Sequence, residues 1–114
     1  NKNILVTERG TSFGYGRLIV DFTGIQVMQE CGVPVIMDAT HSVQCHPTDS
    51  QVTKGNSHFI PLLMRAAVAS GANALYLEVH DQPSIAKSDR ESVLDIKLLE
   101  PLLIDVLKIY HSMN

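Results

Sequence analysis

An arginine and a glycine stand together just after the first apolar segment of the chain, in the run Glu8, Arg9 and Gly10. The guanidinium group of arginine is a planar fork of donors that matches a phosphate or a carboxylate. Glycines and hydroxyl residues follow it in ERGTSFGYG, although their spacing matches no nucleotide-binding fingerprint. Arg9 is therefore a candidate anion-binding residue. An internal pair between Glu8 and Arg9 that only holds the loop is the alternative, and the pattern leaves both open.

Imidazole, carboxylate and amide groups follow the second and third apolar segments. Asp38, His41 and Gln44 come after the second segment, and Glu78 and His80 come after the third. A divalent metal ion, or a general acid–base pair at neutral pH, needs imidazole and carboxylate groups of this kind. Glu78 and His80 share one face of an extended strand, so only one of them can be innermost. Each residue alone is more often a structural hydrogen-bonding residue, so the prediction depends on their convergence.

The three apolar segments are expected to be strands of a parallel sheet, because they are short, rich in β-branched residues and end abruptly in polar residues. They cover residues 4–7, 33–37 and 74–77. A helical pattern follows each of them, over residues 23–30, 57–70 and 97–111. The chain therefore has the order β-α-β-α-β-α, an architecture in which ligands bind at the carboxyl ends of the strands.

Local signals mark the ends of the second and third helices. Ser57 is the expected N-cap of the second helix, and Gly71 is its expected C-terminal stop. Pro101 is acceptable only in the first turn of the third helix, where its missing N–H group has no partner to lose. The third helix carries one apolar stripe, made of Leu99, Leu102, Leu103, Val106, Leu107 and Tyr110.

Three strand-helix units form either an open doubly wound sheet or part of a (β/α)8 barrel. A complete barrel needs about 250 residues, and this chain has 114. Three strands alone would leave open sheet edges that seek partners. We therefore expect residues 1–114 to be one partial domain that lacks the N-terminal strands of a longer polypeptide.

Composition excludes several other classes of protein. The net charge is -3 and the basic residues are scattered, so no surface for nucleic acid is expected. No apolar run reaches the roughly 18 residues of a membrane helix, which favours a cytoplasmic protein without membrane contact. Cys31 and Cys45 lack the spacing of a zinc knuckle or a disulfide framework and are predicted to be reduced thiols.

Several longer motifs resemble one family of enzymes in their order and spacing. The motifs are ERGTSFGYG, DATHSVQ, RAAVASG, LEVH and KSD, which begin at Glu8, Asp38, Arg65, Leu77 and Lys87. Over essentially the whole chain they resemble the C-terminal part of the 3-deoxy-D-manno-octulosonate 8-phosphate synthases, aldol-type synthases that use phosphoenolpyruvate. The first two motifs favour this branch over the heptulosonate and sialic-acid branches. The resemblance implies an α/β fold, namely the C-terminal three units of a (β/α)8 TIM barrel.

The resemblance also implies an activity and roles for single residues. The reaction would condense phosphoenolpyruvate with arabinose 5-phosphate, releasing phosphate, in the biosynthesis of a lipopolysaccharide sugar. Arg9 would hold the phosphate of phosphoenolpyruvate, with Gln44 as a nearby polar contact and Asp38 behind them. His41, Glu78 and Asp89 would be the catalytic residues and would line a metal or water position. An aspartate in a loop usually makes a turn, so only the family pattern selects Asp89.

The family has a metal-dependent and a metal-independent branch, which differ in a residue of the first barrel strand. That strand is not in this sequence, and neither Cys31 nor Cys45 matches the cysteine ligand. Arg90, Glu91 and Ser92 replace the Gly-Pro-Asn usual in the metal-independent branch, which favours a divalent ion such as Zn, Fe or Mn. The family assembles as a homotetramer, so a homo-oligomer is expected. Half-barrel association through open edges is a further possibility.

One departure from the family concerns the lid over the site. Residues 45–58 retain only Gly55 of the glycines that usually make this segment mobile. His46 and His58 within it are expected to be surface histidines rather than a second metal site. The short chain and the altered lid motivate an alternative to the enzyme, namely a non-catalytic remnant that keeps the fold and an anion pocket.

Overall fold

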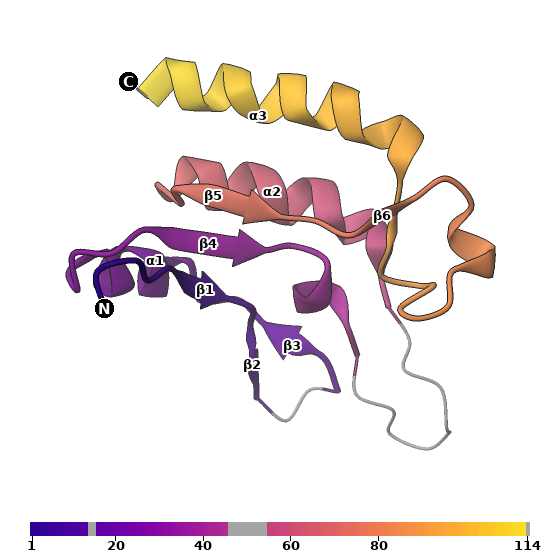
Figure 1. Ribbon diagram of the computed structural model, residues 1–114, viewed down its shortest axis with the longest axis horizontal. Coiled ribbons are helices and arrows are strands. Elements are labelled where there is room, and N and C mark those ends of the chain that lie inside the picture. The colour runs from indigo at the N-terminus through magenta and orange to yellow at the C-terminus, as the bar shows by residue number, and fades with distance from the viewer. Residues whose placement is uncertain (14–15, 46–54, 114) are drawn as a thin grey trace.

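A parallel sheet of three strands forms the centre of the computed structural model, which describes residues 1–13, 16–45 and 55–113. The strands are β1 (Val6–Glu8), β4 (Val35–Asp38) and β5 (Ala74–Tyr76), in the order β1-β4-β5. The register pairs Val6 with Val35 and Asp38 with Tyr76. All three predicted strands and their parallel arrangement are therefore confirmed, and their carboxyl ends point the same way (Figure 1).

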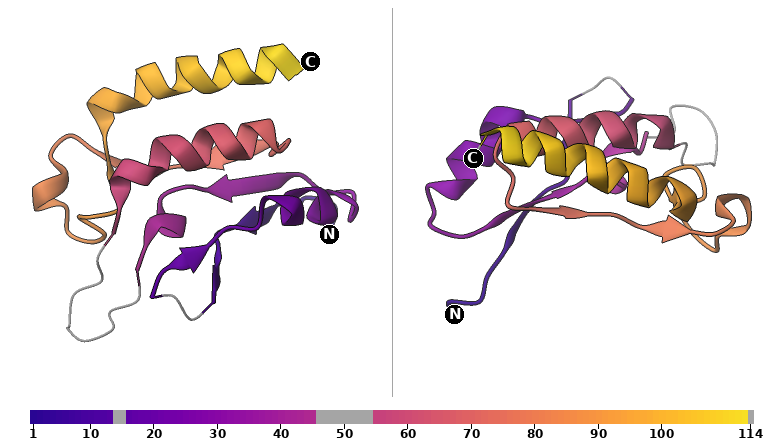
Figure 2. Two further views of the ribbon diagram at one scale, coloured as in Figure 1. Left: turned by 180° about the vertical axis from the view of Figure 1, so that it is seen from behind. Right: turned by 90° about the horizontal axis from the view of Figure 1, so that it is seen from above.

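Three helices accompany this sheet: two cover one of its faces, and the third packs beside the second, as the two views of Figure 2 show. They are α1 (Phe22–Gln29), α2 (Ile60–Ala69) and α3 (Leu99–Met113). Val35 and Met37 of β4 face the helices and are completely buried beside Ile25 of α1 and Ala67 of α2. Strand alternation turns Asp38 to the opposite face, where no helix of the described chain covers the sheet. The helices thus leave one face free for a site.

The ends of the helices differ in part from the prediction. Ser57 is not the N-cap of α2, because Ser57 begins a 3-10 turn (Ser57–Phe59) and the α-helix starts only at Ile60. The backbone N–H of Ser57 donates to the carbonyl of Glu91 at 3.1 Å, which ties this turn to a distant loop. Gly71 follows α2 with a φ of 90°, as its predicted role as a stop requires. Pro101 lies in the first turn of α3, as expected.

Two pairs of very short strands accompany the sheet and were not predicted. β2 (Thr11–Ser12) and β3 (Leu18–Ile19) form an antiparallel hairpin after β1. β6 (Val79–His80) and β7 (Leu94–Asp95) pair in parallel beyond β5. Two-residue strands carry no hydrophobic period, so no sequence pattern could indicate them. The second pair closes the loop that carries Asp89 back onto the strand end that carries Glu78.

The apolar stripe of α3 is only partly covered. Leu102 and Val106 are buried against a core cluster that includes Ile60 and Met64 of α2. Leu107 and Tyr110 are each 51% exposed, although they belong to the same predicted stripe. None of the described helices is long and apolar enough to cross a membrane.

Candidate active site at the strand ends

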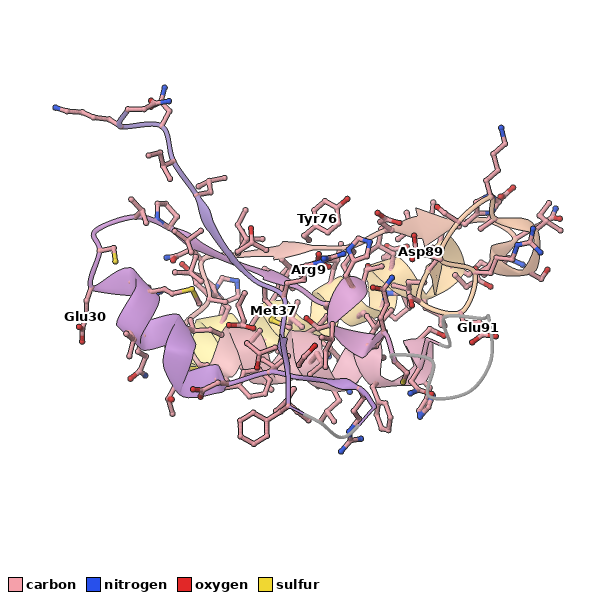
Figure 3. The ribbon with its side chains drawn as sticks, turned by 90° about the horizontal axis from the view of Figure 1, so that it is seen from below. Arg9, Glu30, Met37, Tyr76, Asp89 and Glu91 are labelled. Carbon is pink, nitrogen blue, oxygen red and sulfur yellow. The ribbon has the colours of Figure 1, made fainter. Side chains whose placement is uncertain are left out.

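His41, Glu78 and Asp89 converge beyond the carboxyl ends of the sheet. His41 opens the 3-10 turn after β4 (His41–Val43), Glu78 follows β5, and Asp89 lies in the loop between β6 and β7. One potential ligand atom from each residue lies within 4.8 Å of the others. Figure 3 shows Asp89 near the strand ends, in the same view as Arg9 and Tyr76. The structure therefore brings together the three residues that the sequence put forward as catalytic.

Asp38 orients the imidazole of His41. Its Oδ2 lies 2.8 Å from Nδ1 of His41, and its Oδ1 accepts a hydrogen bond from the backbone N–H of His41 at 3.0 Å. Asp38 is only 5% exposed. A carboxylate at Nδ1 places the ring proton there, which leaves Nε2 as the free lone pair. Nε2 points to Oε1 of Glu78, 3.5 Å away.

Arg9 lies at the mouth of the same site. Its Nε is 3.5 Å from Oδ2 of Asp38, and its side chain is 57% exposed. The predicted alternative, an internal pair between Glu8 and Arg9, is wrong: the carboxylate of Glu8 instead accepts from the backbone N–H of Gly10. A pocket of about 240 Å³ opens beside the guanidinium group. Its lining residues are Thr7, Arg9, Ile36, Asp38, His41 and Tyr76.

Asp89 forms a turn in the backbone and also directs its carboxylate into the site. Its φ of 52° is in the left-handed region, and it is the one described residue other than glycine with a positive φ. Its carbonyl accepts from the N–H groups of Ser92 (2.7 Å) and Val93 (2.9 Å). The side-chain amide of Gln44 donates to its Oδ1 at 2.5 Å. Aspartate tolerates this conformation better than most residues, and such backbone strain occurs preferentially at functional sites.

Tyr76 belongs to this constellation, although the sequence did not indicate it. Its hydroxyl donates to Oε1 of Glu78 at 3.3 Å, and its ring stacks on His41 with centroids 6.1 Å apart. The negative charge of Glu78, and then the hydrogen bond to it, raise the pKa of Tyr76 above its usual value. The phenol therefore stays protonated at neutral pH. The alternation that puts residues 76 and 78 on one face was the available signal.

Other candidate residues lie away from the three. His80 lies beside Asp81, with Nδ1 of His80 2.9 Å from Oδ1 of Asp81. Of Glu78 and His80, Glu78 is therefore the inner residue. Cys31 is exposed, and Cys45 accepts from the amide of Asn56 at 3.1 Å. Neither thiol belongs to the group of potential ligands found among the described residues.

The lid is described only at its two ends. His46 lies outside the described residues, as do the other residues of 46–54, whereas His58 is exposed and packs against Phe59. Gln44 forms a backbone bridge with Gly55, and the N–H of Gly55 donates to the carboxylate of Glu91 at 3.0 Å. The two ends of the lid are thus joined to each other beside the site.

The donor set suits a divalent metal ion. One imidazole nitrogen and two carboxylates are ligands that Zn, Fe and Mn accept, and three protein ligands leave positions open for water or substrate. His41 and Glu78 are only partly exposed, with 15% and 33% of their side chains accessible. Asp38 and Gln44 each hold one ligand from behind, which is how metal sites fix their ligands. The residues present therefore fit a metal ion, without indicating which one.

Comparison with known proteins identifies the family. The family model described as the DAHP synthetase I family matches residues 1–111. The chain belongs to this family. Within it, 2-dehydro-3-deoxyphosphooctonate aldolase of Protochlamydia amoebophila is 50% identical over 110 residues, which are 96% of this chain and 40% of that protein. The enzyme of the same name from Desulfosudis oleivorans is 50% identical over 104 residues, or 90% of this chain and 37% of that protein.

A solved structure of the DAHP synthetase type supports the same conclusion. A truncated form of 3-deoxy-D-arabino-heptulosonate 7-phosphate synthase from Thermotoga maritima superposes with a TM-score of 0.82 at 27% identity, over 99% of this chain and 40% of that chain. The predicted fold, part of a TIM barrel, and the predicted resemblance to the octulosonate branch are both confirmed. The chain spans about 40% of the length of these relatives.

Proposed function

We propose that the protein containing this chain condenses phosphoenolpyruvate with arabinose 5-phosphate to give 3-deoxy-D-manno-octulosonate 8-phosphate and phosphate. The observation that carries the proposal is the convergence of His41, Glu78 and Asp89 beside the pocket of Arg9. The relatives named 2-dehydro-3-deoxyphosphooctonate aldolase support this choice of substrates over the heptulosonate reaction.

The reaction makes demands that these residues can meet. C3 of phosphoenolpyruvate forms a bond to the aldehyde carbon of the sugar phosphate, water adds at C2, and the C2–O bond to phosphate then breaks. Arg9 would bind the phosphate of phosphoenolpyruvate, because its guanidinium group is exposed and its planar fork of donors matches a phosphate. The imidazole of His41 and the carboxylates of Glu78 and Asp89 would hold the water and the aldehyde oxygen in position. This lowers the entropy cost of reaching a reactive geometry.

A divalent ion bound by His41, Glu78 and Asp89 would supply a Lewis acid for the aldehyde or lower the pKa of a bound water. His41 presents the lone pair of Nε2 because Asp38 holds its other nitrogen. Glu78 and Asp89 supply the negative charge that a divalent cation requires. The same three side chains could instead hold an ordered water by hydrogen bonds, and metal analysis of the purified protein distinguishes the two.

Phosphate release in the presence of both substrates tests the proposal. The protein at its natural length should release phosphate only when both are supplied. Glu78→Gln should lower the rate by roughly 10²- to 10⁴-fold, the usual contribution of a positioned acid or base. Glu30→Gln, at an exposed position at the end of α1, is the matched control and should keep the full rate. An unchanged rate in Glu78→Gln would contradict the assignment of this residue.

A non-catalytic protein that retains an anion pocket is the second candidate, and the glycine-poor lid segment favours it. Calorimetry with phosphoenolpyruvate separates the two. Binding that is lost in Arg9→Ala, together with an absence of phosphate release by the wild type, would support the second candidate. Binding accompanied by release supports the enzyme.

Assembly and location are part of the same proposal. We expect a homo-oligomer, because large apolar side chains of α3 are exposed in the described chain. Sedimentation analysis would contradict this expectation if the protein were a monomer at micromolar concentration. A cytoplasmic location remains a prediction from the sequence.

A further inference from the structure

Each of two potential ligands at the site has one neighbour that fixes its orientation. Asp38 holds the imidazole of His41 through Nδ1, and Gln44 holds the carboxylate of Asp89 through its amide. A site that must bind an ion or a water in one geometry needs such support, because an unsupported side chain explores several rotamers. The remaining ligand, Glu78, should therefore have an orienting neighbour of its own.

The backbone of Glu78 is fixed, but its side chain is not fixed by the backbone. Its N–H donates to the hydroxyl of Thr40 at 2.8 Å, and its carbonyl accepts from the N–H of Leu94 at 3.0 Å. The long side chain beyond is one third exposed, at 33%. Ordering a long glutamate side chain costs rotamer entropy. Something beyond the main chain has to hold the carboxylate in place.

Within the part of the chain that the structure describes, two groups contact that carboxylate. The hydroxyl of Tyr76 lies 3.3 Å from Oε1, and Nε2 of His41 lies 3.5 Å from the same oxygen. His41 cannot orient Glu78 while the lone pair of its Nε2 binds a metal ion. Tyr76 is thus the one contact that remains free to orient Glu78 while all three residues act together.

The position of Tyr76 is itself set by the sheet. Tyr76 is the register partner of Asp38 across β4 and β5, and its carbonyl accepts from the N–H of Ala39 at 3.2 Å. This places the ring over the imidazole of His41, at an interplanar angle of 25°, and in the wall of the pocket beside Arg9. One side chain therefore contacts two of the three potential ligands.

We propose that Tyr76 is a positioning residue of this site, whose hydroxyl fixes the carboxylate of Glu78 and whose ring holds the imidazole of His41. The inference deepens the proposed function and depends on its metal-binding form. It gives the hydroxyl and the ring separate tasks, which two substitutions can separate. Tyr76→Phe removes only the hydroxyl, and Tyr76→Leu removes the ring as well.

Titration of the protein at its natural length with Co²⁺, followed by visible absorption, tests this inference. Loss of a neighbour that orients a metal ligand typically weakens metal binding by about 10- to 100-fold. We expect the loss of Co²⁺ affinity in Tyr76→Phe to be near the lower end of this range, because Tyr76 is 46% exposed. Tyr76→Leu should bind Co²⁺ still more weakly than Tyr76→Phe. The absorption bands of bound Co²⁺ should also shift, because the carboxylate changes its geometry. A role limited to fold stability would not move these bands.

Tyr110→Phe is the matched control, since Tyr110 is a tyrosine of similar exposure, 51%, on α3. It should bind Co²⁺ as the wild type does. Equal affinity and identical spectra for Tyr76→Phe and the wild type would overturn the role of Tyr76 and leave the proposed metal site standing. Absence of Co²⁺ binding in the wild type would overturn both, whereas the condensation itself is judged separately by phosphate release.

Discussion

Replacing Asp38 by asparagine should change the tautomer of His41 without changing the shape of the site. Asp38 accepts two hydrogen bonds from His41, from the backbone N–H at 3.0 Å and from Nδ1 at 2.8 Å. An asparagine has one acceptor oxygen in place of two. Whichever way its amide is turned, its NH2 group faces a donor of His41. The ring can relieve this conflict by moving its proton from Nδ1 to Nε2.

The cost can be estimated from the burial of the pair. Asp38 is 5% exposed, so the hydrogen bond is poorly replaced by water, and its loss should cost about 1.5–3 kcal/mol of unfolding free energy. The ion pair with Arg9 adds little, because Arg9 is 57% exposed. A proton on Nε2 removes the lone pair that faces Glu78. Metal affinity should therefore fall by roughly 10- to 100-fold, which is about 1.4–2.8 kcal/mol.

Three measurements check this prediction. Long-range ¹H–¹⁵N NMR reports the tautomer of His41, urea unfolding reports stability, and Co²⁺ titration reports affinity. Asp81→Asn is the matched control, because Asp81 also lies beside a histidine, 2.9 Å from Nδ1 of His80, but its side chain is 76% exposed. Its effect on stability should stay within about 0.5 kcal/mol. The reasoning is refuted if Asp38→Asn keeps the Nδ1–H tautomer and binds Co²⁺ with the affinity of the wild type.

Two further predictions concern the stability of the fold. A Cβ atom at Gly55 would lie 2.1 Å from Oγ of Ser92, so Gly55→Ala should lower the unfolding free energy by about 1–3 kcal/mol. Gly24→Ala, inside α1 with its nearest contact at 3.9 Å, should instead raise it by about 0.5–1 kcal/mol; equal urea midpoints for the two would contradict this. The hydrogen bond from Arg65 lowers the pKa of Asp105, so this carboxylate stabilises the fold above pH 3.8, its ordinary pKa, and that stability is lost as the pH falls through the lowered pKa. The stability difference between the wild type and Asp105→Asn should therefore shrink from neutral to strongly acidic pH, and a difference that grows would contradict the assignment.

The sheet and its helices could be predicted because their signals are local. Val35 and Met37 are buried by the helices, and Ile36 on the opposite face is half-buried in the wall of the pocket, so the strand is one continuous apolar run. Polar residues after each strand then had to meet, since parallel strands end at the same edge. The convergence of His41 and Glu78 follows from this topology alone.

The contacts that orient the site could not be predicted in this way. Gln44 contacts Asp89 although the two residues are 45 positions apart in the sequence. Asp89 reaches this position through a turn in which its φ is positive, and an aspartate in the sequence does not predict such a turn. Tyr76 contacts His41 because of a register between two strands, which hydrophobic patterns do not specify to the residue. Ser57 has the right type for an N-cap, but it begins a 3-10 turn that is tied to Glu91, and α2 starts only at Ile60. Tertiary contacts decided each of these cases.

Holding the three potential ligands in place requires fewer groups than the condensation does. The neighbours that hold the three potential ligands, namely Asp38, Gln44 and Tyr76, are all in this chain. A metal ion or water could therefore be bound with what these residues supply. The condensation needs a second phosphate group to be held at the same time, and within the described site only Arg9 is placed to bind a phosphate. Metal binding and phosphate release can thus fail independently, and a variant that loses one while keeping the other locates its effect in one of the two parts.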